Sequence, residues 1–132
     1  MNKITFISIV LTVIVLTSCK KDKYTPDGPT DIRIHNVSLL TYDSVVVINT
    51  LLESNEYGTV NPGAQTEYKR FEKAYPREQV NMYIDSVSYE FLPDDSVRVL
   101  LQQGKFTFQL DVDTVAKSIS IHVIADAPLD DV

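Results

Sequence analysis

This chain of 132 residues contains two histidines, one cysteine and 18 acidic residues. These types of side chain bind metal ions and act in catalysis. His35 and His122 occupy polar positions in the first and last of the strands expected below. Because the first and last strands of a β-sandwich often pair, one hypothesis is a zinc site made of both histidines with Asp31 or Asp126. Two unrelated surface histidines are the simpler interpretation, and we predict no metal site.

Several acidic residues lie near expected loops, where carboxylate and carbonyl oxygens are able to hold Ca²⁺. They are Asp94, Asp95, Asp111 and Asp113. The chain contains no 12-residue calcium-binding loop, and aspartate favours turns because its side chain hydrogen-bonds the nearby backbone. We therefore interpret these residues as solvated turns.

The sequence carries no catalytic motif. Two carboxylates such as Glu72 and Asp111 have the chemistry for glycoside hydrolysis, but no spacing distinguishes that pair from the other acidic residues. The chain lacks a G-x-S-x-G turn, a Walker loop and a G-x-G-x-x-G loop. We predict that the protein is not an enzyme and has no catalytic residue and no cofactor. A hydrolase with an unrecognised carboxylate site is the least favoured alternative.

The seven tyrosines are the residues that most suggest binding. Exposed aromatic rings beside polar groups bind sugar rings or partner proteins. Tyrosine is also a common half-buried strand residue, which is the competing interpretation. The candidate binding patch consists of Tyr57, Tyr68, Tyr75 and Tyr83 with the polar residues Glu67, Lys69 and Arg70. We assign to the core Phe71, Tyr89, Phe91, Phe106 and Phe108.

The N-terminal segment has the pattern of a secretory signal peptide, predicted over residues 1–18. Its apolar run, Ile4–Thr17, is shorter than the roughly 20 residues that a membrane-spanning helix needs. The sequence Leu16-Thr17-Ser18-Cys19 resembles the bacterial lipobox. The resemblance implies that the Cys19 thiol receives a diacylglyceryl group and that the chain is cleaved before Cys19.

Lipidation of Cys19 would block the only thiol, which excludes a disulfide, thiolate catalysis and a cysteine metal site. Residues 19–30 are charged or rich in Pro and Gly and are predicted to be a flexible tether. The lipid predicts a cell-envelope protein anchored to the outer membrane. The start of the tether, residues 19–22, resembles in part the signal by which Bacteroidota lipoproteins reach the cell surface. A plain spacer that leaves the protein in the periplasm is the alternative.

Composition excludes several classes of protein. The formal net charge of −6 argues against nucleic-acid binding, which needs a cationic surface. With 44% hydrophobic residues and 23% charged residues, the chain has the composition of an ordinary globular domain.

Beyond the tether the apolar residues alternate with a period of two, which predicts strands. Phe106–Val112 shows the cleanest alternation, and Val80–Ile84 with Val87–Phe91 predicts a hairpin closed by Asp85 and Ser86. Further strands are expected at Ile32–Val37, Val45–Ile48, Gly58–Val60, Thr66–Phe71, Val97–Leu101 and Ser118–Val123. This pattern predicts an all-β fold: one antiparallel β-sandwich of seven or eight strands and Ig-like architecture over residues 31–125. Residues 126–132 are predicted to be a frayed acidic tail.

Three stretches together resemble a group of small, uncharacterised lipoproteins from Bacteroidota. They are YGTVNPG at 57–63, EYKRFEKAY at 67–75 and GKFTF at 104–108. The resemblance implies an Ig-like or transthyretin-like β-sandwich behind a lipobox signal peptide, and it implies no activity and no substrate. The chain departs from the group at Asp85-Ser86, where a glycine is expected, and from Pro93 onward.

The functional expectation is a cell-envelope lipoprotein that acts as a non-catalytic binding or structural accessory module. It would dock on an envelope protein through a sheet edge or through the region from Tyr57 to Tyr75. The alternative is a small glycan-binding surface lipoprotein that uses exposed tyrosines. The sequence does not indicate the oligomeric state.

Overall fold

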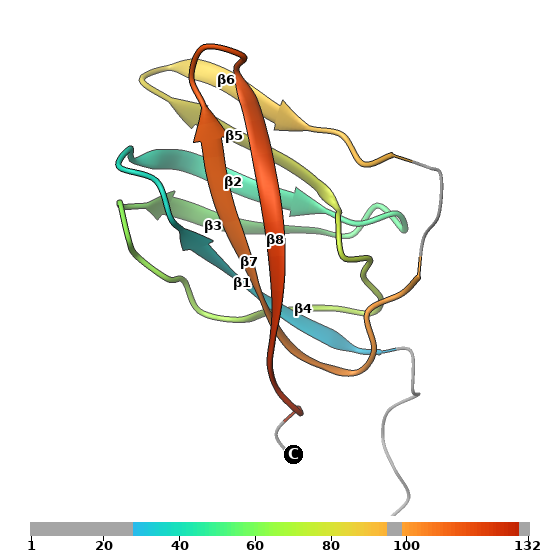
Figure 1. Ribbon diagram of the computed structural model, residues 1–132. Helices are drawn as coiled ribbons and strands as arrows, with labels where there is room; N and C mark the ends of the chain where they lie inside the picture. The colour runs from blue at the N-terminus through green and yellow to red at the C-terminus, as the bar shows by residue number, and fades with distance from the viewer. Residues whose placement is uncertain (1–27, 95–98, 130–132) are drawn as a thin grey trace, which may run out of the picture.

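The computed structural model describes residues 28–94 and 99–129, which form eight strands in two packed sheets (Figure 1). The predicted all-β sandwich is confirmed. The signal peptide, Cys19 and the tether up to residue 27 lie outside the described residues. The strands are β1 (Thr30–Asn36), β2 (Tyr42–Ile48), β3 (Ser54–Val60), β4 (Lys69–Phe71), β5 (Gln79–Ile84), β6 (Val87–Phe91), β7 (Gly104–Asp113) and β8 (Ser118–Ala127).

The two sheets have the strand orders β4-β1-β7-β8 and β3-β2-β5-β6. All neighbours pair antiparallel except β1 and β7, which are parallel. The chain visits the second sheet between β1 and β7, and this path provides the long crossover that a parallel pair requires. In an immunoglobulin constant domain the first two strands share a sheet with the fourth and fifth. Here the first and second strands lie in different sheets, so the fold is Ig-like in its layers and not in its strand order.

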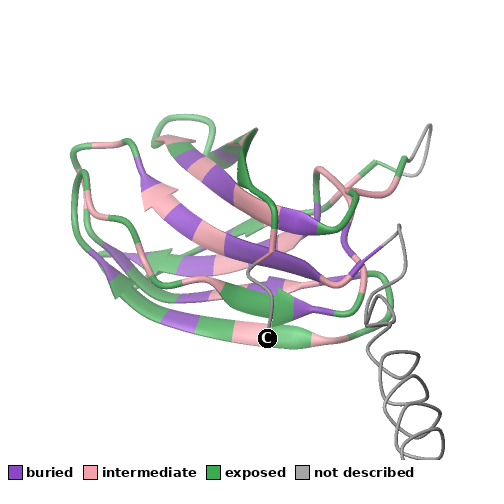
Figure 2. Cartoon of the chain, turned by 90° about the horizontal axis from the view of Figure 1, so that it is seen from below, coloured by how far each residue is buried: buried purple, intermediate pink, exposed green. Residues whose placement is uncertain are grey.

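The core lies between the sheets because one face of each strand is apolar. In β1, Ile32 and Ile34 are completely buried, whereas Arg33 and His35 are only partly so. Figure 2 shows this alternation as bands of buried and exposed residues along the strands. Burying one such side chain stabilises the fold by about 1.5–3 kcal/mol. The buried cluster consists of Ile32, Ile34, Tyr42, Val45, Val47, Tyr57, Val60, Phe71, Ala74, Val80, Met82, Ile84, Tyr89, Phe108, Leu110 and Ile119.

The core predictions are right for Phe71, Tyr89 and Phe108, whose side chains are buried. Phe91 is partly buried and packs against the cluster, and Phe106 is also only partly buried. Both residues lie near the margin of the sandwich.

Some strand boundaries differ from the prediction. β3 begins at Ser54, four residues earlier than expected, because its first residues are polar and exposed and show no apolar alternation. β4 has three residues instead of six. Val99–Leu101 is not a strand, and Val97 lies outside the described residues. β8 continues through Asp126 and Ala127, so the tail predicted from residue 126 is wrong at its first two positions.

The hairpin between β5 and β6 turns at Asp85 and Ser86, as predicted. Both residues have positive φ, 49° and 63°. This conformation is that of the type I′ turn, whose twist matches that of the flanking strands. Glycine is favoured at such positions, and Asp tolerates them better than most other residues. The turn therefore forms here without the glycine expected from the resemblance.

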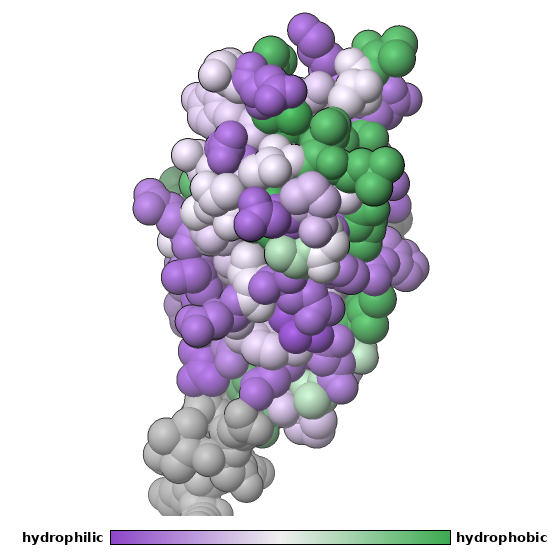
Figure 3. Space-filling view, turned by 90° about the vertical axis from the view of Figure 1, so that its left-hand side faces the viewer, coloured by the Kyte–Doolittle hydropathy of each residue, from purple (hydrophilic) through white to green (hydrophobic). Residues whose placement is uncertain are grey.

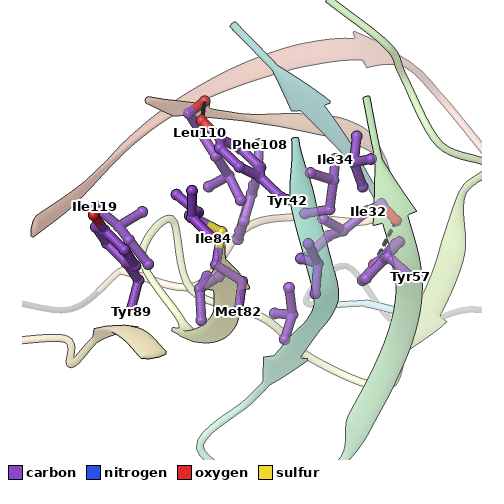
Figure 4. Close-up of a cluster of buried hydrophobic side chains, with 14 of the residues drawn as sticks. Ile32, Ile34, Tyr42, Tyr57, Met82, Ile84, Tyr89, Phe108, Leu110 and Ile119 are labelled. Atoms are coloured by element: carbon purple, nitrogen blue, oxygen red, sulfur yellow. Dashed lines mark hydrogen bonds between the residues drawn. The ribbon is translucent and has the colours of Figure 1, made fainter. Parts of the chain in front are cut away.

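Hydrogen bonds from buried side chains join the two sheets (Figure 4). The Tyr42 hydroxyl donates to the Leu110 carbonyl at 2.8 Å, and the Tyr57 hydroxyl donates to the Ile32 carbonyl at 2.7 Å. The Asn36 side-chain amide donates to the Val60 carbonyl at 3.0 Å. Each bond links a strand of one sheet to a strand of the other, and thereby sets how the sheets face each other.

Replacing Tyr57 by Phe tests the contribution of these bonds. Burial, and secondarily the Asp31 carboxylate, raises the pKa of Tyr57 above its usual 10. The folded state therefore holds this proton more tightly than the unfolded chain does, so the stabilisation is complete below pH 10 and declines as the pH rises above it. We expect Tyr57→Phe to lower the free energy of unfolding by about 1 kcal/mol at pH 7. Above pH 10, the free energy of unfolding of the variant should fall less steeply with pH than that of the original protein. Urea denaturation of residues 20–132 at pH 7 and above pH 10 measures both. An unchanged alkaline slope would contradict this assignment.

Candidate functional site

The seven residues of the predicted binding patch do not form one surface. Tyr57, Glu67 and Lys69 line a groove at one side of the sandwich. Tyr68 and Arg70 contact β1 residues of the first sheet. Tyr83 is 48% exposed and belongs to β5 in the second sheet, and Tyr75 is partly buried in the connection before β5.

The groove runs between the edge of β3 and the chain segment that precedes β4. Its volume is about 430 Å³. Glu56 and Glu67 supply negative charge and Lys69 supplies positive charge. The lining residues are Glu56, Tyr57, Thr59, Val60, Asn61, Ala64, Gln65, Thr66, Glu67 and Lys69.

Pairing with β1 holds the segment that forms one wall of the groove. Asn36 N–H donates to the Ala64 carbonyl at 3.0 Å, and Thr66 N–H donates to the Ile34 carbonyl at 2.9 Å. The Thr66 hydroxyl then accepts from Ile34 N–H at 2.9 Å, in place of a backbone carbonyl. Gln65 forms an isolated β-bridge with His35, and Lys69 pairs with Ile32 in the register of β4 with β1. Lys69 lies four residues after Gln65, whereas Ile32 lies three residues before His35. The segment therefore has one extra residue relative to β1, as in a β-bulge.

Tyr57 does not present an exposed ring, contrary to the prediction. It is 9% exposed, its hydroxyl is bonded to Ile32 across the sandwich, and the Lys69 ammonium lies 6.0 Å from the ring centroid. Its ring points into the core, and Val60, three residues later, is buried as well. Strict alternation would place the two residues on opposite faces, but the pairing of β3 with β2 shifts register near Gly58, which has a positive φ of 70°. The groove is therefore polar at its rim and has a largely covered aromatic base.

Tyr68 lies across the outer face of the first sheet. The Arg33 guanidinium carbon is 4.8 Å and the Lys105 ammonium 5.3 Å from its ring centroid. Its hydroxyl donates to Asp126 Oδ2 at 2.9 Å, and that oxygen also accepts from the Thr107 hydroxyl. Partial desolvation and the hydrogen bond to Asp126 raise the pKa of Tyr68. Tyr68 thus ties the groove wall to β8, and its ring is engaged with cations of its own chain.

Side chains close the same side of the sandwich below the groove. Arg70 Nε and Nη2 donate to the two Asp31 carboxylate oxygens at 2.8 and 3.2 Å. The Asn55 amide donates to the Arg70 carbonyl at 2.9 Å, and the Asn49 amide donates to the Lys73 carbonyl at 2.8 Å. The Glu53 carboxylate accepts from Glu72 N–H. The bonds of Asn55, Asn49 and Glu53 join the β2–β3 hairpin to β4 and the residues after it, and the Arg70–Asp31 pair joins β4 to β1.

The two histidines lie in the same sheet but not in contact. Gln109 of β7 is the register partner of both His35 and His122. Two strand spacings, about 9–10 Å, therefore separate their Cα atoms, and Gln109 lies between them. Within residues 28–94 and 99–129, no three His, Cys, Asp or Glu side chains gather closely enough to hold a metal ion.

The acidic residues considered for calcium or catalysis have local roles. Asp113 Oδ1 accepts from the N–H groups of Val115 and Ala116 in the turn after β7. Thr30 of β1 pairs with Phe71 on one side and with Gly104 of β7 on the other. Asp111 lies seven residues further along β7 than Gly104. Glu72 and Asp111 are therefore separated by roughly 20 Å along the strands, whereas a glycosidase pair needs about 5–9.5 Å. Asp95 lies outside the described residues.

The part of the chain that the structure describes contains no helix long and apolar enough to cross a membrane. No protein-family model matches the chain, and no curated protein matches it.

The hydroxyl of Tyr68 is predicted to stabilise the fold, and Tyr83 provides a matched control. Tyr68→Phe keeps the ring between its cations and removes the bond to Asp126, so we expect the free energy of unfolding to fall by about 0.5–1 kcal/mol. Tyr83→Phe removes a hydroxyl from an exposed ring and should change it by less than about 0.5 kcal/mol. Urea denaturation at pH 7 compares the two variants. Equal effects would mean that the Tyr68 hydroxyl has no structural role.

Proposed function

We propose that this chain is a lipid-anchored protein of the cell envelope that acts as a non-catalytic binding or structural accessory module. The lipobox-like sequence Leu16–Cys19 supports the anchor, and the tether of residues 19–30 supports a domain held clear of the membrane surface. The outer membrane is the proposed site, with the domain in the periplasm or at the cell surface. Membership of the Bacteroidota lipoprotein group is part of the same proposal. The departure from the immunoglobulin strand order favours the transthyretin-like form of the expected sandwich.

The groove beside β3 is the observation that carries the docking proposal. It brings together Tyr57, Glu67 and Lys69, which the sequence places in one binding patch, and its volume suits several side chains of a partner. Glu56 and Glu67 at its rim provide charges that a complementary protein surface is able to recognise. We propose that an envelope protein docks here.

Protein docking is favoured over glycan binding because of how the tyrosines lie. A sugar ring needs a free aromatic face. Tyr42, Tyr57 and Tyr89 are buried, and the Tyr68 ring carries two cations of its own chain. Tyr83 is half exposed, but it lies on the second sheet and not in the groove.

Substitution of Cys19 tests the anchor. The thiol is the only group in the lipobox able to form the thioether, so Cys19→Ala should produce an unprocessed precursor that incorporates no labelled palmitate. Gel mobility and label incorporation in producing cells measure both properties. Ser18→Ala, which keeps a small residue beside the thiol, is the control and should still be lipidated. Label in the Cys19→Ala protein would refute the proposed anchor.

Photo-cross-linking from the groove tests the docking site. A benzophenone side chain at exposed position 65, in the full lipidated chain, should capture one envelope protein in living cells. Glu67→Lys reverses a rim charge and should reduce that adduct at least about tenfold, which corresponds to a loss of about 1.4 kcal/mol. Glu90→Lys makes the same charge change on β6, away from the groove, and should leave the adduct unchanged. Absence of any specific adduct would refute docking through the groove.

A further inference from the structure

The strand β8 is the longest unpaired edge of the described structure. It stands at the end of its sheet, and β7 is its only partner there. It has ten residues, and its register with β7 is regular from Ser118 to Ala125, with one irregularity between Ala125 and Ala127. The backbone groups on its other side point away from the sheet and are available to another strand.

The other three edges carry the features by which proteins prevent unwanted pairing. β4 has three residues and β6 has five. β3 contains Glu56 and Gly58, and its pairing with β2 is interrupted by register shifts. Short length, charge and bulges all discourage the addition of a strand. In contrast, residues 118–125 of β8 include no Lys, Arg, Asp, Glu, Pro or Gly.

Apolar side chains accompany this edge. Ile119 is buried, whereas Ile121 and Val123 are only partly buried and pack at the margin of the core. Ile124, on the opposite face of β8, is 36% exposed. Figure 3 shows a band of apolar side chains on the side of the molecule where Figure 1 places β7 and β8. A neighbouring strand would complete the burial of this band.

We propose that β8 receives an extended strand from another protein, with uncharged residues that alternate between apolar side chains facing the core and small or polar side chains facing outward. The lack of charge along residues 118–125 calls for a neutral partner strand, because an unpaired charge would be desolvated beside Ile121 and Val123. The new ladder would supply affinity, and the alternate side chains would supply specificity.

The charge of the chain argues against a second copy of it as the occupant. The formal net charge is −6, so two copies repel each other, and a net charge far from zero favours the monomer. Thr30 pairs with Gly104, and Ala127 pairs with Lys105, so the tether leaves the domain beside the end of β8. The inference rests on the proposed lipid anchor, because the partner is sought where that anchor holds the domain.

The test places a benzophenone side chain at position 124 of the full lipidated chain in producing cells. We expect an adduct with a different protein, and mass mapping should locate it in an extended segment of alternating apolar residues. Ser120→Lys with His122→Lys adds two charges to exposed positions of β8 and should lower the adduct yield at least about tenfold, a loss of about 1.4 kcal/mol. Gln102→Lys with Gln103→Lys adds the same charges in the loop before β7 and should have no effect.

Three results would overturn the inference: no adduct, an adduct of twice the mass of the chain, or a yield insensitive to the lysines on β8. Thermal unfolding of the β8 variant verifies that it folds. If it does not fold, the identity and the mapped segment of the adduct from position 124 decide the question alone. The groove probe at position 65 separates this inference from the proposed function. An adduct from position 65 without one from position 124 refutes strand addition and leaves docking intact.

Discussion

The hydrogen bond from Tyr57 to the Ile32 carbonyl is the interaction on which the rest of this structure depends. It crosses from β3 to β1, and with the bond from Tyr42 to Leu110 it fixes how the two sheets face each other. A buried main-chain carbonyl needs a partner, and a buried phenol needs an acceptor, so each bond satisfies two groups at once. The position of β3 over β1 in turn determines where the groove lies.

This arrangement makes the two sides of the sandwich different. On the β3–β4 side, Asn49, Asn55 and Glu53 bond to main-chain groups of β4 and the residues after it, and the groove occupies the remaining opening. On the other side, β6 and β8 approach each other, and partly buried Ile121, Val123 and Phe91 pack at the margin. A polar groove on one side and a neutral strand edge on the other are two distinct surfaces for contact with other proteins.

Local pattern predicts much of this fold, and long-range contacts explain what it misses. β5, β6 and β7 follow from strict alternation, and the turn at Asp85 and Ser86 lies where the pattern of the two strands requires it. β3 was not predicted at its full length because a polar edge strand shows no apolar alternation.

The candidate site was harder to predict than the fold. The alternation of β3 does not indicate that its tyrosine meets a carbonyl of β1, 25 residues away in sequence. Likewise, Asp126 has the composition of a tail, and the local pattern does not show its contacts with Tyr68, 58 residues earlier, and with Thr107 of β7. His35 and His122 share a sheet as considered, but the order of strands places β7 between them.

Amide hydrogen exchange of the lipidated protein tests most directly the claim that a partner completes the β8 edge. The comparison is between membranes isolated from producing cells and the protein purified in detergent. The account predicts that the peptide covering residues 118–127 exchanges slowly in membranes and faster after purification, while β1 and β2 remain equally protected in both. Equal exchange of residues 118–127 in the two samples would contradict it.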